Sequence, residues 1–331
     1  MLLRSLEVSH VRNLQSFRLT PHPSTNFIIG SNGSGKTSLL EAIHILSSGR
    51  SFRTPMAKKI VSHGSQELVV FGEIDIGTEH LVRAGIRKDV EGSTLIRIDG
   101  VRHERMSDLA LLLPTLALDA SAFELVDGGP AERRQLLDWG LFHVEHLFHV
   151  EWKAYQVAVK QKSNLLRAGN PGEAFKQIPY WNSQQAHWGN LVHQARTRYM
   201  ETLQHALSDT LQQYVADADI SIEYRAGWST QQHASLQDCL EAHVASEIEK
   251  QVCGYGPHRA DLQIYWNGVP ARDICSRGQK KLVLYAVRLA QVMTLYRLRN
   301  IAPVLLLDDI PAELDSRNLE KITRFLSDYP C

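Results

Sequence analysis

The chain of 331 residues has few cysteines and no net charge, and both absences narrow the classes of protein that it can be. Its four cysteines form no C-x-x-C pair and no zinc spacing, which suits reduced thiols in the cytoplasm. The 36 basic and 36 acidic residues cancel, so any binding to a polyanion must come from a local patch. No apolar run approaches membrane-spanning length and no leader pattern opens the chain, which predicts a cytosolic protein without a membrane partner.

A glycine-rich motif lies near the N-terminus. Residues 30–37 read Gly-Ser-Asn-Gly-Ser-Gly-Lys-Thr and directly follow the apolar run Phe27-Ile28-Ile29. A helical pattern begins straight after the motif and is expected to end near Ser47-Ser48-Gly49. A strand before and a helix after are the context of a phosphate-binding loop, so a merely structural turn is the weaker interpretation.

The residue types in this motif suit a nucleotide and a magnesium ion. Gly33 and Gly35 let backbone N–H groups turn toward an anion, and the following helix presents its positive end. Lys36 can reach the β and γ phosphates, and the Thr37 hydroxyl can ligate Mg²⁺. The predicted nucleotide-binding residues of this segment are Gly30, Ser31, Asn32, Gly33, Ser34, Gly35, Lys36, Thr37 and Ser38.

Periodicity along the chain predicts an α/β domain with an antiparallel β arm and an inserted helical hairpin. Strands are expected at residues 2–8, 16–19, 67–76, 80–87, 94–98, 101–105 and 220–224. Helices are expected from 131 to about 168, from about 184 to 216, and within 236–250, with a loop at 169–172.

A second set of nucleotide-site residues lies near the end of the sequence. Residues 302–309 read Ala-Pro-Val-Leu-Leu-Leu-Asp-Asp, a pattern that predicts a buried parallel strand ending in two carboxylates, as in a Walker B segment. Asp308 is then the Mg²⁺ carboxylate, and Asp309 stands where a carboxylate would orient water. Glu313-Leu314-Asp315 is interpreted as a D-loop.

A third element, residues 276–281, opens an amphipathic helix with Ser-Arg-Gly-Gln-Lys-Lys. Taken alone, these residues are equally compatible with an ordinary capped helix that has a basic first turn. Their place just before the Walker B segment favours an ABC signature, in which the helix start of one subunit caps the γ-phosphate held by another. Ser276, Gly278 and Gln279 are therefore predicted to bind nucleotide across a homodimer.

Three further segments carry a family resemblance. Residues 255–262, 49–54 and 130–138, taken with the motifs above, resemble the RecF family of bacterial recombination mediators, which is related to SMC-type ATPase heads. The resemblance runs through essentially the whole chain. It implies an SMC-like, ABC-type P-loop ATPase head formed by residues 1–130 and 253–331, with a mainly α-helical insertion at 131–252.

The same resemblance implies an activity and a set of partners. It implies an ATP-dependent homodimer that clamps gapped DNA and helps RecR and RecO to load RecA in DNA repair and replication restart. The expected cofactors are ATP and Mg²⁺, and Lys36, Asp308 and Asp309 are the expected catalytic residues. Because Asp309 is one methylene shorter than the Glu common at its position, we expect slow ATP hydrolysis that works as a switch. We also expect DNA to stimulate this ATPase.

Two departures from the family pattern stand out. Residues 118–123 lack the glutamine with which SMC-like ATPases sense Mg²⁺ and nucleotide. The resemblance also leads us to expect another strand and a switch residue after the helix at 316–326, whereas the sequence stops at Cys331, which suggests a shortened C-terminus.

Basic residues near the phosphate loop are candidates for DNA contact. The predicted DNA-binding residues are Arg50, Arg53, Lys58, Lys59, Arg133 and Arg134. A solvated basic loop is an equally good interpretation of the first four, and an ion pair with Glu132 or Asp138 is an alternative for the arginine pair. His258 and Arg259 either lie near phosphate or hydrogen-bond to Asp261 in the core.

Other features are assigned to structure, and two rival functions stay open. His143, His146 and His149 drift around a helix, so they are not expected to converge on a metal. Aromatic residues of the helical segments are expected in the hairpin core more than in base stacking: Trp139, Trp152, Tyr155, Tyr180, Trp181 and Trp188. The rivals are an ABC-type nuclease or transport ATPase, and a nucleotide-gated scaffold whose DNA contact is incidental.

Overall fold

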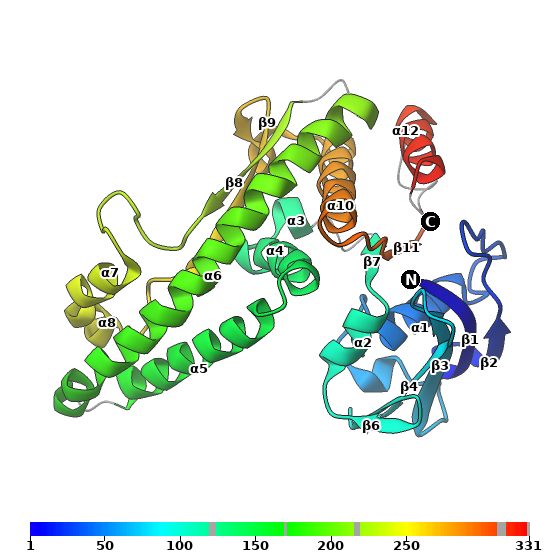
Figure 1. Cartoon of the computed structure of the whole chain (residues 1–331), viewed down its shortest axis with the longest axis horizontal. Helices are drawn as coiled ribbons and strands as arrows, with labels where there is room; N and C mark the ends of the chain where they lie inside the picture. Colours follow the sequence, from blue (N-terminus) through cyan, green and yellow to red (C-terminus); the bar gives the residue numbers. More distant parts are fainter. Residues whose placement is uncertain (119–123, 169–170, 215–218, 310–315, 330–331) are drawn as a thin grey trace. The chain divides into compact units, whose positions relative to one another are not determined.

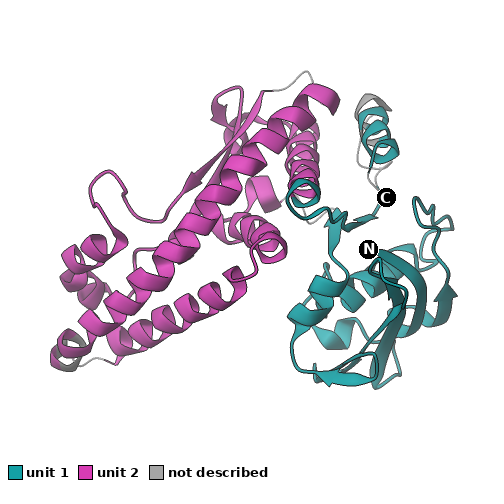
Figure 2. Ribbon diagram, in the orientation of Figure 1, with its two compact units in different colours: residues 1–122, 295–331 teal, residues 123–294 magenta. Residues whose placement is uncertain are grey.

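The computed structural model describes residues 1–118, 124–168, 171–214, 219–309 and 316–329. The chain forms two compact units (Figure 2). Unit 1 comprises Met1–Ala122 and Leu295–Cys331, and unit 2 comprises Phe123–Thr294. Within the described ranges, no helix is both long and apolar enough to cross a bilayer.

Unit 1 is built on an antiparallel sheet of order β2-β1-β3-β4-β5-β6 (Figure 1). The strands are β1 (Leu2–Val11), β2 (Leu14–Leu19), β3 (Glu67–Asp75), β4 (Val82–Asp89), β5 (Thr94–Ile98) and β6 (Val101–His103). Alternate residues of β3 are buried, as a sheet with one solvated face requires. Helix α1 (Lys36–Ser48) packs Leu46 into the core formed by Leu6, Leu68 and Val70. This confirms the expected antiparallel β subdomain.

Unit 1 also contains a pair of parallel strands, one of which belongs to the predicted Walker B segment. Strand β11 (Val304–Leu307) pairs in parallel with β7 (Thr115–Leu118), which places Leu307 beside Leu118. The expected parallel strand is present, although only Leu306 in it is fully buried. The remaining elements of unit 1 are η1 (Ala57–Lys59), α2 (Met106–Leu112) and α12 (Ser316–Ser327).

The strand expected before the phosphate loop is not formed. Residues 27–29 have no strand conformation, and the side chains of Phe27 and Ile29 are 86% and 92% exposed. A strand needs a neighbour for its backbone N–H and C=O groups. In the part of the chain that the structure describes, β7 and β11 pair only with each other, so the apolar run has no strand beside it.

Unit 2 is mainly helical, with a small sheet of order β10-β9-β8. A long hairpin of α5 and α6, the largest feature of this unit in Figure 1, confirms the expected helical hairpin. Its elements are α3 (Glu124–Asp127), α4 (Pro130–Val144), α5 (Phe148–Arg167), α6 (Pro171–Tyr214), β8 (Ile220–Arg225), α7 (Leu236–Ala242), α8 (Val244–Lys250), η3 (Pro257–Arg259), β9 (Asp261–Trp266), β10 (Val269–Pro270) and α9 (Ala271–Ile274). Helix α10 (Arg277–Arg299) begins in unit 2 and continues into unit 1.

Two helix boundaries differ from the sequence-based expectation. The helix expected from 131 to 168 is interrupted between Val144 and Phe148, where α4 ends and α5 begins. The second helix begins at Pro171 instead of about 184 and contains Pro179, which is exposed. Pro171 is tolerated as the first residue of α6, because the N–H that it lacks has no helical partner there, whereas Pro179 lies inside the helix.

The boundaries of the compact units differ from the expected domain boundaries. Residues 253–294, expected in the head, belong to unit 2 because β9 pairs with β8 and Arg133 of α4 binds Asp261 of β9. The boundaries between compact units are at 122 and 294, whereas the expected domain boundaries are at 130 and 252. The division into folding domains stays a prediction.

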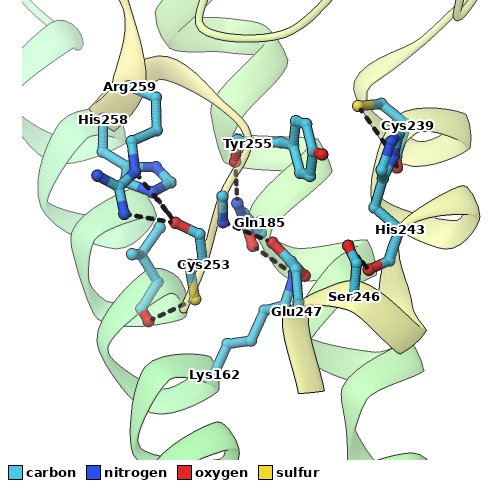
Figure 3. A network of polar contacts seen from close by, with 12 residues as sticks. Lys162, Gln185, Cys239, His243, Ser246, Glu247, Cys253, Tyr255, His258 and Arg259 are labelled. Atoms are coloured by element: carbon cyan, nitrogen blue, oxygen red, sulfur yellow. Dashed lines mark hydrogen bonds and ion pairs between the residues drawn. The ribbon is translucent and has the colours of Figure 1, made fainter. Parts of the chain in front are cut away.

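A buried ion pair ties α5 to α8 in unit 2 (Figure 3). Lys162 Nζ lies 2.5 Å from Glu247 Oε2, and both side chains are almost wholly buried. Gln185 Oε1 accepts a bond from Lys162, and the backbone N–H of Gly254 donates to Glu247. Such a pair is costly to break, because the remaining charge stays buried without its partner.

We expect Lys162→Met to destabilise unit 2 by about 3–5 kcal/mol, because Glu247 then lies unpaired in the core. Adding Glu247→Gln should restore much of this loss, since the buried charge is gone and an amide oxygen can still accept the N–H of Gly254. Urea unfolding followed by circular dichroism measures both effects. The exposed Lys160→Met is the matched control, and a double variant no more stable than the single one would contradict this account.

Candidate nucleotide-binding site

The phosphate loop has the backbone conformation that its glycines permit. Gly33 and Gly35 have φ angles of 80° and 100°, in the left-handed region that favours glycine. A Cβ atom on Gly35 would also lie 2.8 Å from a methyl carbon of Leu14. The first turn of α1 contains no acidic residue, so its positive end is left for an anion.

The side chains of Lys36 and Thr37 extend from this loop to different partners. Lys36 Nζ donates to the carbonyl oxygens of Gly30 and Ser31, at 2.8 and 3.0 Å. Thr37 Oγ1 donates to Asp308 Oδ1 at 3.0 Å, across 271 positions of sequence. The tertiary fold therefore brings together the hydroxyl and the carboxylate that the sequence proposed for Mg²⁺, both of them hard oxygen ligands.

The two carboxylates that follow β11, Asp308 and Asp309, lie in different environments. The backbone N–H of Asp308 donates to the carbonyl of Leu118 at the end of β7, which holds Asp308 at the edge beside the loop. Asp309 is exposed and has a φ angle of 56°. The proposed D-loop at 313–315 lies outside the described residues, as does the segment 119–123 in which a sensor glutamine was sought.

Asn13 braces the loop and was not identified from the sequence. Its Nδ2 donates to the carbonyl of Gly33, and its Oδ1 accepts from Ser38 Oγ, both at 2.7 Å. Asn13 lies in the tight turn between β1 and β2, next to Arg12, whose φ angle is 55°. A turn of this kind carries no nucleotide motif, because the contact that matters joins residues 20 and 25 positions apart.

Arg12 connects the same turn to the basic segment, which we define as residues 50–59. Its guanidinium binds the buried carboxylate of Glu41 on α1 and the carbonyl of Lys59. Ser51 donates a hydrogen bond to the same carboxylate. The basic segment is therefore anchored to the helix that follows the phosphate loop.

Four basic side chains of this segment are exposed, as DNA contact requires: Arg50, Arg53, Lys58 and Lys59. Lys88 of β4 joins them by donating to the carbonyl of Gly49, and burial together with the charge of Arg50 lowers its pKa. Phe52 packs edge-on against His44, with ring centroids 5.6 Å apart. That contact is within the protein, so Phe52 is a packing residue of the segment.

The signature residues lie at the exposed start of α10 in unit 2. Ser276 Oγ accepts from the N–H of Gln279, and Gln279 Oε1 accepts from the N–H of Ser276, which is a capping box. Apart from the backbone of its own helix and its chain neighbours, no described residue has a heavy atom within 4 Å of a Cβ added to Gly278. The side chains of Ser276 and Gln279 thus form an ordinary helix cap. Residues 276–278 are exposed, so a partner can reach them.

The other basic candidates are engaged inside unit 2. Arg133 is largely buried and binds both carboxylate oxygens of Asp261, at 2.7 and 3.1 Å, so its ion pair is with Asp261 and not with Glu132 or Asp138. Arg134 donates to the carbonyl of Ala260, and burial lowers its pKa. We therefore exclude this pair from the proposed DNA surface.

His258 and Arg259 also belong to an internal network (Figure 3). His258 lies 2.6 Å from the Tyr155 hydroxyl, and the guanidinium of Arg259 donates to the carbonyl of Cys253. Burial lowers the pKa of His258 to about 4. Neither residue contacts Asp261 among the described hydrogen bonds, and their role is to hold the turn before β9.

The histidine series and the aromatic residues have mainly structural environments. His143 is buried against Trp139, and burial lowers its pKa to about 4, whereas His146 and His149 are exposed. Tyr155 is fully buried, and Trp152 stacks beneath the guanidinium of Arg196, so these aromatics pack in the core of unit 2. Tyr180, in contrast, is 61% exposed.

Comparisons with known proteins identify the family and the fold of the chain. The protein-family model described as the RecF/RecN/SMC N terminal domain matches residues 2–329 of this sequence. The DNA replication and repair protein RecF of Marinomonas sp. (strain MWYL1) is 36% identical over 326 residues, which are 98% of this chain and 87% of the relative. Two solved structures share the fold over 99% of this chain: RecF-ATP, a recombination mediator of the RecFOR pathway (24% identity, TM-score 0.88, 90% of that chain), and an Smc head domain from Pyrococcus furiosus (15% identity, TM-score 0.56, 86% of that chain).

Proposed function

The chain belongs to the RecF family, and from this premise we propose that it is an ATP-dependent DNA-binding protein of DNA replication and repair that clamps gapped DNA as a homodimer. The observation that carries the proposal is the hydrogen bond between Thr37 and Asp308. It unites two nucleotide motifs that are far apart in the sequence, at the positive end of α1.

Each residue of the site has a defined part in ATP binding and hydrolysis. The loop backbone holds the phosphates, and Lys36 turns from the carbonyls of Gly30 and Ser31 to the β and γ phosphates. Thr37 and Asp308 fit Mg²⁺, which neutralises charge on the phosphates when bound. Asp309, exposed beside Asp308, orients the attacking water.

A second copy of the chain completes the site. Ser276 and Gly278, at the open start of α10, meet the γ-phosphate bound to the other copy's loop. ATP then holds the two copies together, and hydrolysis removes the contact that bridges them. Since Asp309 is one methylene shorter than the Glu common at its position, we infer a weak ATPase that times release, and we propose that DNA stimulates it.

The proposed cellular role follows that of the family. We infer that the chain acts with RecO and RecR to promote RecA loading, as the RecFOR pathway named for the solved relative suggests. We place it in the cytoplasm, because three of its cysteines, Cys239, Cys253 and Cys275, are buried free thiols suited to a reducing compartment.

Replacing Arg50 and Arg53 by alanine tests DNA binding. We expect at least about 10-fold weaker binding to gapped duplex in the presence of ATP, and a salt slope smaller by about 2, because two phosphate contacts are lost. The control is Arg97→Ala/Arg102→Ala, which removes the same charge from opposed, exposed positions of β5 and β6.

Fluorescence anisotropy with duplex, single-stranded and gapped DNA at several salt concentrations measures both variants. Equal affinity of the two variants would contradict the assignment of the basic segment. DNA affinity that is independent of ATP would favour the nucleotide-gated scaffold instead, and Mn²⁺-dependent cleavage would favour the nuclease.

A further inference from the structure

Three potential metal ligands converge in unit 2, and none of them belongs to the predicted nucleotide motifs. The ligand atoms of His233, Cys239 and His243 lie within 4.8 Å of one another. Cys239 and His243 are four positions apart at the end of α7, so they share one face of the helix. His233 approaches them from the turn that precedes α7, and its ring lies 5.3 Å from that of His243. In the described residues this is the one cluster with such geometry.

The rings and the thiol are already held in place. His243 Nδ1 lies 2.7 Å from the carbonyl oxygen of Cys239 and 3.9 Å from its Sγ (Figure 3). When Nδ1–H donates to that carbonyl, Nε2 keeps its lone pair, as in histidines whose other nitrogen binds a metal. Tyr255 packs on the same ring at 4.2 Å, which limits its rotation.

Burial shields the thiol of Cys239 from solvent, since the residue is fully buried. A divalent cation that reaches the thiol replaces its proton and binds the thiolate.

We propose that His233, Cys239 and His243 bind a zinc ion, with a fourth position open to water. Two imidazoles and one thiolate are ligands that zinc prefers, and three protein ligands plus water are a common zinc coordination. Zinc bonds of about 2.0–2.3 Å place ligand atoms roughly 3.3–3.6 Å apart, so atoms that now lie up to 4.8 Å apart must approach by up to about 1.5 Å. His233 can supply this movement, since it lies in a turn outside any helix or strand.

The binding step balances without a redox partner. The Cys239 thiol and Zn²⁺ give a zinc thiolate and one proton, and the two imidazoles bind through neutral nitrogen atoms. The ion would cross-link the turn before α7 to the end of that helix. Through the ring of Tyr255 it would also stiffen the segment before β9, where the carbonyl of Tyr255 accepts a bond from Gln185.

Metal titration of the full chain tests the proposal. Co²⁺ should produce a thiolate-to-metal absorption band with one equivalent bound, and Zn²⁺ should abolish it by competition. We expect Zn²⁺ at about 100 times its Kd to raise the melting temperature of unit 2 by about 5 °C. Cys239→Ser should remove the band, and His233→Ala should weaken zinc binding at least about 10-fold.

Matched variants separate the site from general effects on the fold. Cys253→Ser changes another buried thiol of the same unit, and His187→Ala changes an exposed histidine of α6, so both should keep the band and the thermal shift. His233 lies outside any helix or strand, so His233→Ala should fold normally. The loss of zinc binding by this variant can therefore be measured even if Cys239→Ser unfolds. No band with unmodified protein, or a band that survives Cys239→Ser, would overturn the proposal.

Discussion

A Lys36→Met protein is expected to lose at least about 100-fold in ATP affinity while keeping its fold. In the proposed nucleotide complex the ammonium makes charge-assisted hydrogen bonds with phosphate, each of which contributes about 1.5–3 kcal/mol. Methionine has a similar length and no charge, so it fills the space without that contribution. Isothermal titration with ATP and Mg²⁺ measures the loss directly.

The fold should tolerate this change because, among the described residues, the Lys36 ammonium bonds to two carbonyls of the exposed loop. We expect the free energy of unfolding to change by less than about 0.5 kcal/mol. Lys160→Met, the same substitution at an exposed position of α5, should bind ATP as the unmodified chain does. ATP-dependent DNA binding retained by Lys36→Met would show that the nucleotide site lies elsewhere.

A Ser276→Asp protein is expected to bind ATP normally and to lose ATP-dependent dimerisation by about 100-fold or more. Aspartate is as good a helix cap as serine, so α10 should begin where it does now. In the proposed dimer its carboxylate faces the γ-phosphate of the other copy, and like charges in contact cost several kcal/mol. Light scattering with and without ATP measures the dimer.

A matched substitution distinguishes this effect from a change in helix capping. Ser235 caps α7 in the same way, by accepting from the N–H of Asp238, and does not belong to the signature. Ser235→Asp should therefore dimerise normally. If Ser276→Asp dimerises as strongly as the unmodified chain, residues 276–281 are not a signature. They are then an ordinary capped helix start, which their side-chain geometry also fits.

The motifs of the nucleotide site were predictable because their chemistry is local. A glycine loop and its lysine lie within eight consecutive residues, and two carboxylates end one short apolar strand. The basic segment was recognised for the same reason, and its four cations prove to be exposed. The ion pair of Arg133 could not be predicted from the sequence, because its partner Asp261 lies 128 positions further along the chain.

The strand expected at Phe27-Ile28-Ile29 shows where local pattern is insufficient. An apolar run is compatible with a strand, but hydrogen bonding to a neighbouring strand decides whether one forms. In the described structure no strand lies beside it, and two of its three side chains are exposed. The proposed zinc site was not predicted from the sequence, because its ligands are one thiol and two histidines and the spacing of the cysteines does not indicate them.

Sequence alone was sufficient to identify the family and to predict the nucleotide loop and the Walker B carboxylates, since each depends on residues adjacent in the chain. Tertiary structure was needed for every feature that joins distant residues. The parallel register of β7 and β11 brings Asp308 to Thr37, the turn at Asn13 braces Gly33, and the turn before α7 brings His233 to Cys239 and His243. Such contacts depend on strand register and helix packing, which the whole fold determines.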